Sequence, residues 1–196
     1  MIPAGRAIAA MRSGLQALAG LVLCVSCTSG VSAMEPGVAV TITQVGETFV
    51  VEVLAEVPVP LAGAWEVLTD FDHMAQFIGN VKSSRVVRRD ENTLWVRQEG
   101  VAEYGPFSLP FKSEREIRLE PKRRIVAKSL SGSMRRMESE ARLGQLADGV
   151  RIRYHAEAVP ELTLARMFGA TIVRHEIEEQ FREMISEMMR RYPRRD

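Results

Sequence analysis

Apolar residues recur at every second position along most of the chain from Val81 to Pro160, and this alternation constrains the fold more than any other feature. Successive side chains of an extended strand point to opposite faces, so alternation is typical of strands with one buried face. The turns between the runs are short, which favours an antiparallel meander over parallel strands joined by helical crossovers. The alternation predicts strands at Ser84–Arg89, Thr93–Val101, Phe107–Leu119, Arg124–Leu130, Met134–Leu143 and Val150–Ala158.

The last part of the chain changes to a helical period, with charged residues on the remaining sides of the turn. Arg190 and Arg191 lie where cations complement a helix C-terminus, and Pro193 ends the predicted helix. Gly169 interrupts the earlier part of this segment, so we expect a local bend there. The apolar stripe consists of Val173, Ile177, Phe181, Met184, Ile185 and Met188.

The meander is preceded by one more strand and a helical stretch. Residues Thr48–Val57 alternate in the same way and predict a half-buried strand. Pro58 and Pro60 end this strand and start a helical stretch that runs from Leu61 into residue 78. We expect the segment Asp70–His73 to break this stretch into two short helices, with its aspartates capping the second one.

The helical stretch also carries the most distinctive motif of the chain, residues 60–71 (PLAGAWEVLTDF) followed by residues 76–81 (QFIGNV). This motif resembles the entry helices of the START-like, helix-grip superfamily (SRPBCC) of lipid-, quinone- and polyketide-binding proteins. The likeness is strongest to its polyketide cyclase and coenzyme-Q-binding branch, where a Trp-x-x-Leu-Thr-Asp-Phe run opens the mouth of an apolar cavity. That branch often has proline where Gly79 stands, so we expect a looser turn into the next strand here.

The resemblance spans about Thr48 to Arg191 and implies an α+β helix-grip fold. We therefore expect a curved antiparallel sheet of about seven strands wrapped around a long C-terminal helix, with two short helices after the first strand. The corresponding domain organisation is a signal peptide at residues 1–33, an N-terminal extension at 34–47 and a START-like domain at 48–192.

The N-terminus has the features of an export signal. Arg6 and Arg12 supply a positive n-region, and the apolar run Leu15–Val25 is short for a membrane span. Small residues in Val31-Ser32-Ala33 suit a signal peptidase, which predicts cleavage after Ala33 and a periplasmic or secreted protein.

Two alternatives to soluble export are an uncleaved membrane anchor and a lipoprotein anchored at Cys24 or Cys27. The residues before either cysteine make a poor lipobox, so soluble export is favoured. Both cysteines lie in the leader, and cleavage would leave a mature chain without a thiol or a disulfide. Removing Arg6 and Arg12 from the 26 basic residues leaves 24 against 25 acidic ones, which argues against a nucleic-acid-binding protein.

The sequence contains no recognisable catalytic set. The histidines His73, His155 and His175 are far apart and lack metal-ligand spacing, and no serine lies in a nucleophile elbow. His155 shares the parity of the polar residues on its strand, and His175 lies on a charged helical stretch, so both are expected to face solvent. We expect no metal and no cofactor, and a binding role is favoured over an enzymatic one.

Arg115 is the exception to the alternating pattern. It has the parity of the apolar residues Phe111 and Ile117 on its strand, which would direct a permanent charge into the interior. A guanidinium in that position needs a partner or a polar ligand group. Alternatively, a β-bulge near Pro110 returns Arg115 to solvent, or an internal salt bridge neutralises it.

The resemblance implies that some of the aromatic and apolar residues line a cavity between the sheet and the C-terminal helix, with segment 164–172 at its border and the stripe from Val173 to Met184 covering the sheet. The expected function is to bind or carry a hydrophobic small molecule (a lipid, quinone or polyketide-like compound), a role compatible with transient membrane contact. One alternative is a cyclase or hydrolase-like enzyme that uses Arg115, Tyr154 or His73 as polarising groups, and another is a protein-interaction module with a filled core. The predicted ligand-binding residues are Trp65, Phe71, Phe77, Phe107, Phe111, Arg115, Tyr154, Phe168 and Ile172.

Overall fold

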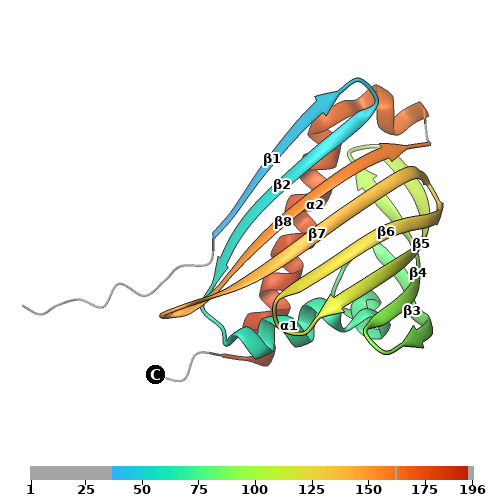
Figure 1. The fold of residues 1–196 in the computed structure, drawn as a ribbon. Helices are drawn as coiled ribbons and strands as arrows, with labels where there is room; N and C mark the ends of the chain where they lie inside the picture. The colour runs from blue at the N-terminus through green and yellow to red at the C-terminus, as the bar shows by residue number, and fades with distance from the viewer. Residues whose placement is uncertain (1–36, 162, 194–196) are drawn as a thin grey trace, which may run out of the picture. The chain divides into compact units, whose positions relative to one another are not determined.

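The computed structural model describes residues 37–161 and 163–193, although not the side chains of residues 104, 107 and 163–168. These residues form one sheet and three helical elements (Figure 1). In chain order the elements are β1 (Gly37–Val45), β2 (Thr48–Val57), α1 (Leu61–Thr69), the 3-10 helix η1 (Phe71–Gln76), β3 (Val81–Asp90), β4 (Thr93–Tyr104), β5 (Phe107–Glu120), β6 (Arg124–Gly132), β7 (Met134–Leu146), β8 (Gly149–Pro160) and α2 (Thr163–Arg191).

The sheet is antiparallel throughout, with the strand order β1-β2-β8-β7-β6-β5-β4-β3. Consecutive strands from β3 to β8 pair as a meander, and β2 then pairs with β8, for example Val53 with Tyr154. Figure 1 shows the sheet curving around α2, with α1 near the C-terminal end of that helix. This arrangement confirms the predicted helix-grip fold.

One part of the fold differs from the sequence-based expectation. The sheet has 8 strands and not about seven, because Gly37–Val45, which was assigned to the N-terminal extension, forms the edge strand β1. Its Val40 and Ile42 are buried against the core, whereas Val38 and Val45 remain exposed. A tight turn at Gly46, with φ of 60°, pairs β1 with β2. Val38, Val40 and Ile42 share one parity and alternate with Thr41 and Thr43, but Gln44 and Val45 reverse the pattern, so the alternating run is short.

The junction between α1 and η1 also departs from the expectation that its aspartates cap a helix. Asp70 is the residue before η1 but makes no side-chain bond to a backbone N–H of that helix. Its carboxylate instead accepts hydrogen bonds from His73 (2.6 Å) and from Arg191 of α2 (2.7 Å). Asp72 accepts a hydrogen bond from the backbone N–H of Val86 in β3 (2.7 Å). Both aspartates thus join η1 to its neighbours.

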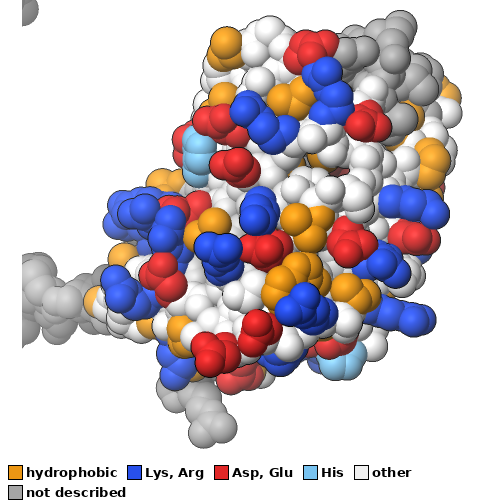
Figure 2. All heavy atoms as spheres, turned by 45° about the vertical axis from the view of Figure 1, so that its right-hand side comes forward, with side chains coloured by type: hydrophobic (Ala, Val, Ile, Leu, Met, Phe, Trp, Pro, Cys, Tyr) orange, Lys and Arg blue, Asp and Glu red, His pale blue; other side chains and the backbone are white. Residues whose placement is uncertain are grey.

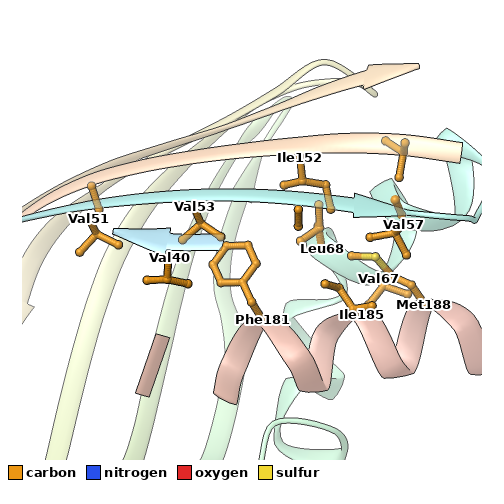
Figure 3. Close-up of a cluster of buried hydrophobic side chains, with 14 of the residues drawn as sticks. Val40, Val51, Val53, Val57, Val67, Leu68, Ile152, Phe181, Ile185 and Met188 are labelled. Atoms are coloured by element: carbon orange, nitrogen blue, oxygen red, sulfur yellow. The ribbon is translucent and has the colours of Figure 1, made fainter. Parts of the chain in front are cut away.

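The interior is most tightly filled where α1 and the C-terminal half of α2 meet β2 and β8. Val57, Val67, Val150 and Met188 are 0% exposed there. Figure 3 shows the side chains of Phe181, Ile185 and Met188 pointing from α2 toward the sheet. α1 approaches α2 closely because Gly63 has no side chain: an added Cβ would lie 2.6 Å from the ring of Tyr192.

The bend predicted in the C-terminal helix is confirmed. Gly169 has φ of 65° and ψ of −157°, so α2 consists of a short first part and a long second part that meet at this glycine. A positive φ of this size is accessible to glycine at little steric cost.

The outer face of the sheet carries charged side chains of both signs. Arg97 pairs with Glu114 (3.0 Å), and Arg151 pairs with Glu56 (2.6 Å), in each case across neighbouring strands. Figure 2 shows acidic and basic side chains interspersed over the face that it displays. This face therefore lacks the continuous basic surface typical of nucleic-acid-binding proteins.

Candidate ligand cavity

A cavity of about 370 Å³ lies between the concave face of the sheet and α2. The sheet contributes small side chains to its wall, among them Ala127 and Ala141, which leave room beneath the helix. The helix contributes the apolar residues Ile172, Ile177 and Phe181. The wall is mainly apolar, so the cavity suits a molecule with a large apolar surface.

The structure brings together most of the predicted ligand-binding residues that it describes fully. Phe71, Phe111, Arg115, Tyr154 and Ile172 all line the cavity. They come from η1, β5, β8 and α2, which lie far apart in the sequence. The side chains of Phe107 and Phe168, two further predicted residues, lie outside the described part of the structure.

Two predicted residues do not line the cavity. Trp65 is half-buried on α1, and its carbonyl accepts a hydrogen bond from the Thr69 hydroxyl (2.8 Å). Phe77 packs against the buried residues around α1 and also against those around η1 and β4, with the guanidinium carbon of Arg191 5.4 Å from its ring centroid. Both rings therefore support the α1–η1 region, where helical spacing alone could not separate packing from cavity lining.

The stripe of α2 that was expected to cover the sheet borders the cavity as well. Val173, Ile177, Phe181 and Met184 all belong to the wall, although Phe181 also packs in the buried cluster with Tyr154. These side chains face the sheet as predicted, and they also form part of the cavity wall. Sequence periodicity indicates which way a side chain points and not how far away the opposite wall lies.

Arg115 points into the cavity and forms part of a buried polar chain. It donates a hydrogen bond through Nη2 to Oε1 of Gln98 on β4. Gln98 in turn donates to Oγ of Ser84 (2.9 Å), and Ser84 donates to the carbonyl oxygen of Phe71 (2.5 Å). The chain thus connects the cavity arginine to η1. Burial lowers the pKa of the Arg115 guanidinium, and its attraction to Tyr154 only partly offsets this effect.

Neither alternative for Arg115 is observed. A bulge is present in the β5–β6 pairing, but its extra residue is Leu130 on β6, because Glu114 pairs with Ser131 and Arg115 with Ser129. Leu130 is 47% exposed, and Arg115 keeps its inward direction. No carboxylate within the described ranges forms an ion pair with Arg115, and its Nε atom is buried without a hydrogen-bond partner.

Tyr154 lines the same cavity as Arg115, from β8. Its ring packs against Phe181 with 5.5 Å between centroids, and its hydroxyl is hydrogen-bonded to Ser139 of β7. Burial raises the pKa of Tyr154, while the bond to Ser139 and the charge of Arg115 act in the opposite direction. At neutral pH the hydroxyl is therefore protonated and can donate a hydrogen bond into the cavity.

Sequence reasoning missed several polar residues of the wall. Gln98 has the same parity as the buried residues Leu94 and Val96, so the argument that identified Arg115 would also have found it. Ser139 and Gln180 carried no comparable signal, because short or amide side chains are common on either face of a strand or helix.

The loop between η1 and β3 is held against α2 at the edge of the cavity. Asn80 donates a hydrogen bond to Glu176 (2.6 Å) and accepts one from Gln180 (3.4 Å). Burial raises the pKa of Glu176, against the effect of the Asn80 bond. The backbone N–H of Gly79 donates to both carboxylate oxygens of Glu183, at 3.1 and 3.0 Å. The loop at Gly79 is therefore pinned and not loose, through an N–H that a proline would lack.

None of the three histidines belongs to the cavity wall. His73 is 56% exposed and pairs with Asp70, and His155 pairs with Glu52 on the outer face at 2.6 Å. His175 is exposed on α2. Across residues 37–161 and 163–193, no cluster of His, Cys, Asp and Glu side chains has a geometry that could hold a metal ion. The site offers an apolar enclosure, one guanidinium and a tyrosine hydroxyl.

Comparison with known proteins identifies the family. Residues 57–188 match the family described as polyketide cyclase / dehydrase and lipid transport. The chain belongs to this family. The matched span runs from the end of β2 to the last turns of α2 and so includes every wall of the cavity. Family membership connects the chain with hydrophobic small-molecule binding and with polyketide cyclase chemistry.

Solved structures share the fold at low sequence identity. An aromatase/cyclase from a Streptomyces species is 17% identical with a TM-score of 0.64, covering 74% of this chain and 95% of that one. A STAR-related lipid transfer protein from Xanthomonas axonopodis is 12% identical, also with a TM-score of 0.64, covering 78% and 93%. A protein from Thermus thermophilus is 16% identical at the same TM-score, covering 72% and 98%. No curated protein matches the chain.

Proposed function

We propose that the protein binds and carries a hydrophobic small molecule in the cavity between the sheet and α2. The observation that carries this proposal is the mainly apolar cavity wall contributed by η1, the central strands and the helix. Its volume of about 370 Å³ falls within the range of small-molecule sites, roughly 300 to 1,000 Å³. A lipid, a quinone or a polyketide-like compound has the apolar surface that such a wall can cover.

The energetics are sufficient for useful affinity without covalent chemistry. Burying ~300 Å² of apolar ligand surface at ~25 cal/mol/Å² gives a gross gain of ~7.5 kcal/mol. Association entropy and side-chain ordering remove part of this gain. Dissociation constants in the micromolar range are therefore expected for a ligand that fits the wall and makes one polar contact.

The second candidate function is a cyclase-type enzyme, which the neighbouring Arg115 and Tyr154 favour. A guanidinium and a phenol lining one cavity could polarise a carbonyl group of a chain folded into it. One of the similar structures is an aromatase/cyclase, which agrees with this candidate at the level of the fold. Turnover of a bound polyketide-like chain, lost in Arg115→Met, would favour this enzymatic function over carriage.

We also propose that the protein is exported with cleavage after Ala33. The n-region, apolar run and small residues of the leader support this, and β1 begins at Gly37, shortly after the predicted cut. None of the described helices is long and apolar enough to cross a bilayer. The intact mass of protein from the cell envelope should match residues Met34 to Asp196. An acylated Cys27 or a full-length chain would contradict the proposal.

The binding role is tested by titrating the protein with a neutral naphthylamine fluorophore that brightens in apolar surroundings. Ile172→Trp adds bulk to the cavity wall on α2, whereas Thr171→Trp adds the same ring at the exposed neighbouring position. We expect Ile172→Trp to weaken fluorophore binding by roughly tenfold or more, because overfilling displaces the ligand. Thr171→Trp should leave it unchanged. Equal binding by both variants would contradict the proposed site.

A further inference from the structure

One charged side chain of the cavity wall, Arg115, has no counter-ion among the described residues. Lys112, Arg115 and Glu176 are its charged wall residues among those described. Lys112 is exposed and pairs with Glu99 at 3.4 Å, and Glu176 accepts a hydrogen bond from Asn80 at the rim. Arg115 alone of the three extends into the interior without a counter-ion or a rim contact among the described residues. A guanidinium cannot lose its proton at physiological pH, so its charge remains in this apolar surrounding.

The donors around Arg115 are only partly used. Gln98 accepts one hydrogen bond from Nη2, and the buried Nε has no acceptor. The hydroxyl-bearing side chain of Tyr154 lines the same cavity. A buried donor that lacks an acceptor is destabilising, and more so when it belongs to a charged group. An incoming group that accepts from Nε would remove this penalty.

The surroundings of Arg115 define what else the incoming molecule must contain. On its own strand, Phe111 and Ile117 line the wall on either side of it, and across the cavity α2 presents Ile177 and Phe181. The cation therefore lies among apolar wall residues. A small inorganic anion would leave this wall uncovered, whereas an amphiphile would cover the wall and also supply an acceptor.

We propose that the carried molecule is a carboxylic acid with an apolar tail, and that Arg115 binds its ionised carboxyl group inside the cavity with help from the Tyr154 hydroxyl. The inference rests on the proposed carrier function and specifies its ligand class. A carboxylate carries a single charge and two oxygens, which match one guanidinium and the hydroxyl beside it. A phosphate dianion would leave a second negative charge in a mainly apolar wall where Arg115 is the one cation without a counter-ion among the described residues.

The test compares dodecanoate with dodecanol, which has the same tail and a neutral head group, by displacement of the neutral naphthylamine fluorophore. The wild type should bind dodecanoate about 10- to 100-fold more tightly, as expected for hydrogen bonds to a charged group. Arg115→Met should remove this preference and leave dodecanol binding within a few-fold. Arg115→Lys, which keeps the charge but not the planar fork, should show an intermediate preference.

Arg118→Met is the matched control, because Arg118 lies on the same strand but is exposed and pairs with Glu116. It should keep the wild-type preference for the acid. Equal affinities of the wild type for the acid and the alcohol, unaffected by Arg115→Met, would overturn this inference and leave the carrier function standing. Failure of every apolar compound to bind the wild type would overturn both. A parallel loss of acid and alcohol binding in Arg115→Met would show a structural role and also overturn the inference.

Discussion

The two ends of α2 face the same sheet but meet very different surroundings. At the C-terminal end, Ile185 and Met188 fill the space between the helix and β2, and Met188 is completely buried. Toward the N-terminal end, Ile172 and Ile177 face a cavity across from β5 and β7. The C-terminal part of α2 therefore lies at a filled end of the domain, the closed end, and its N-terminal part lies at the cavity end, the open end.

The difference comes from what is placed beside the helix. At the closed end α1 lies against α2, with Tyr192 packed on Gly63. Arg191 there bridges Asp70 (2.7 Å) and Glu187 (2.6 Å), which fastens the helix to the α1–η1 junction. The cavity end has no such filling element among the described residues. The comparison indicates that the closed end supplies stability, which allows the cavity end to keep its interior free for a ligand.

The largest effect should come from the same truncation made at both ends. Met188→Ala should lower the free energy of unfolding by roughly 2 to 5 kcal/mol, because a buried side chain leaves a void. Met137→Ala, on the half-buried cavity wall of β7, should lower it by about 1 kcal/mol or less and should change affinity for the naphthylamine fluorophore. Chemical denaturation measures both. Similar losses of stability at the two ends would break the comparison.

A second effect concerns the ion cluster that fastens the closed end. Hydrogen bonds from Arg190 and Arg191 lower the pKa of Glu187 from 4.5 to about 2. Burial of the carboxyl group acts in the opposite direction but does not outweigh these bonds. A carboxyl group whose folded pKa is depressed stabilises the fold above its unfolded pKa, and this contribution disappears as the pH falls through the folded value.

The substitution Glu187→Gln should therefore lower the free energy of unfolding by about 1 to 3 kcal/mol at pH 7, and the difference from wild type should shrink between about pH 4.5 and pH 2. Glu179→Gln is the control, since Glu179 pairs with Arg182 at an exposed position and should matter little. Denaturation curves at several pH values measure the effect. A pH-independent difference would assign the loss to packing.

The smallest effect is expected at the cavity end. Arg115→Met without ligand should leave the free energy of unfolding unchanged or raise it by about 1 to 2 kcal/mol, because an unpaired buried charge is replaced by an apolar side chain of similar length. Thermal or chemical denaturation of ligand-free protein measures this. A clear destabilisation would mean that the bond to Gln98 holds the wall together, and Arg115 would belong to the supporting structure.

Most of the fold could be predicted because its signals are local. The strands from β2 to β8 show alternation strong enough to locate them within a few residues, and the glycine at 169 marks the bend in α2. β1 was missed because its alternating run is short: Val38, Val40 and Ile42 share one parity, but Gln44 and Val45 reverse it. Pairing between distant segments, as for Gly79 with Glu183, leaves no trace in local periodicity.

The site was predicted less completely, for a physical reason. Parity showed that Arg115 points inward, and the structure places it in the cavity wall. Parity could not show whether an inward side chain meets another side chain or open space, so Trp65 and Phe77 were grouped with residues that do line the cavity. That distinction depends on the distance between sheet and helix, which no single segment encodes.

The central claim, that the open end holds an apolar molecule, is tested most directly by methyl NMR of protein labelled at its methionine methyl groups. Met134, Met137 and Met184 line the cavity, whereas Met188 lies in the closed end. Adding dodecanoate should shift the signals of the cavity methionines and leave that of Met188 nearly unchanged. Shifts centred on Met188, or none at any cavity methionine under saturating ligand, would contradict the account.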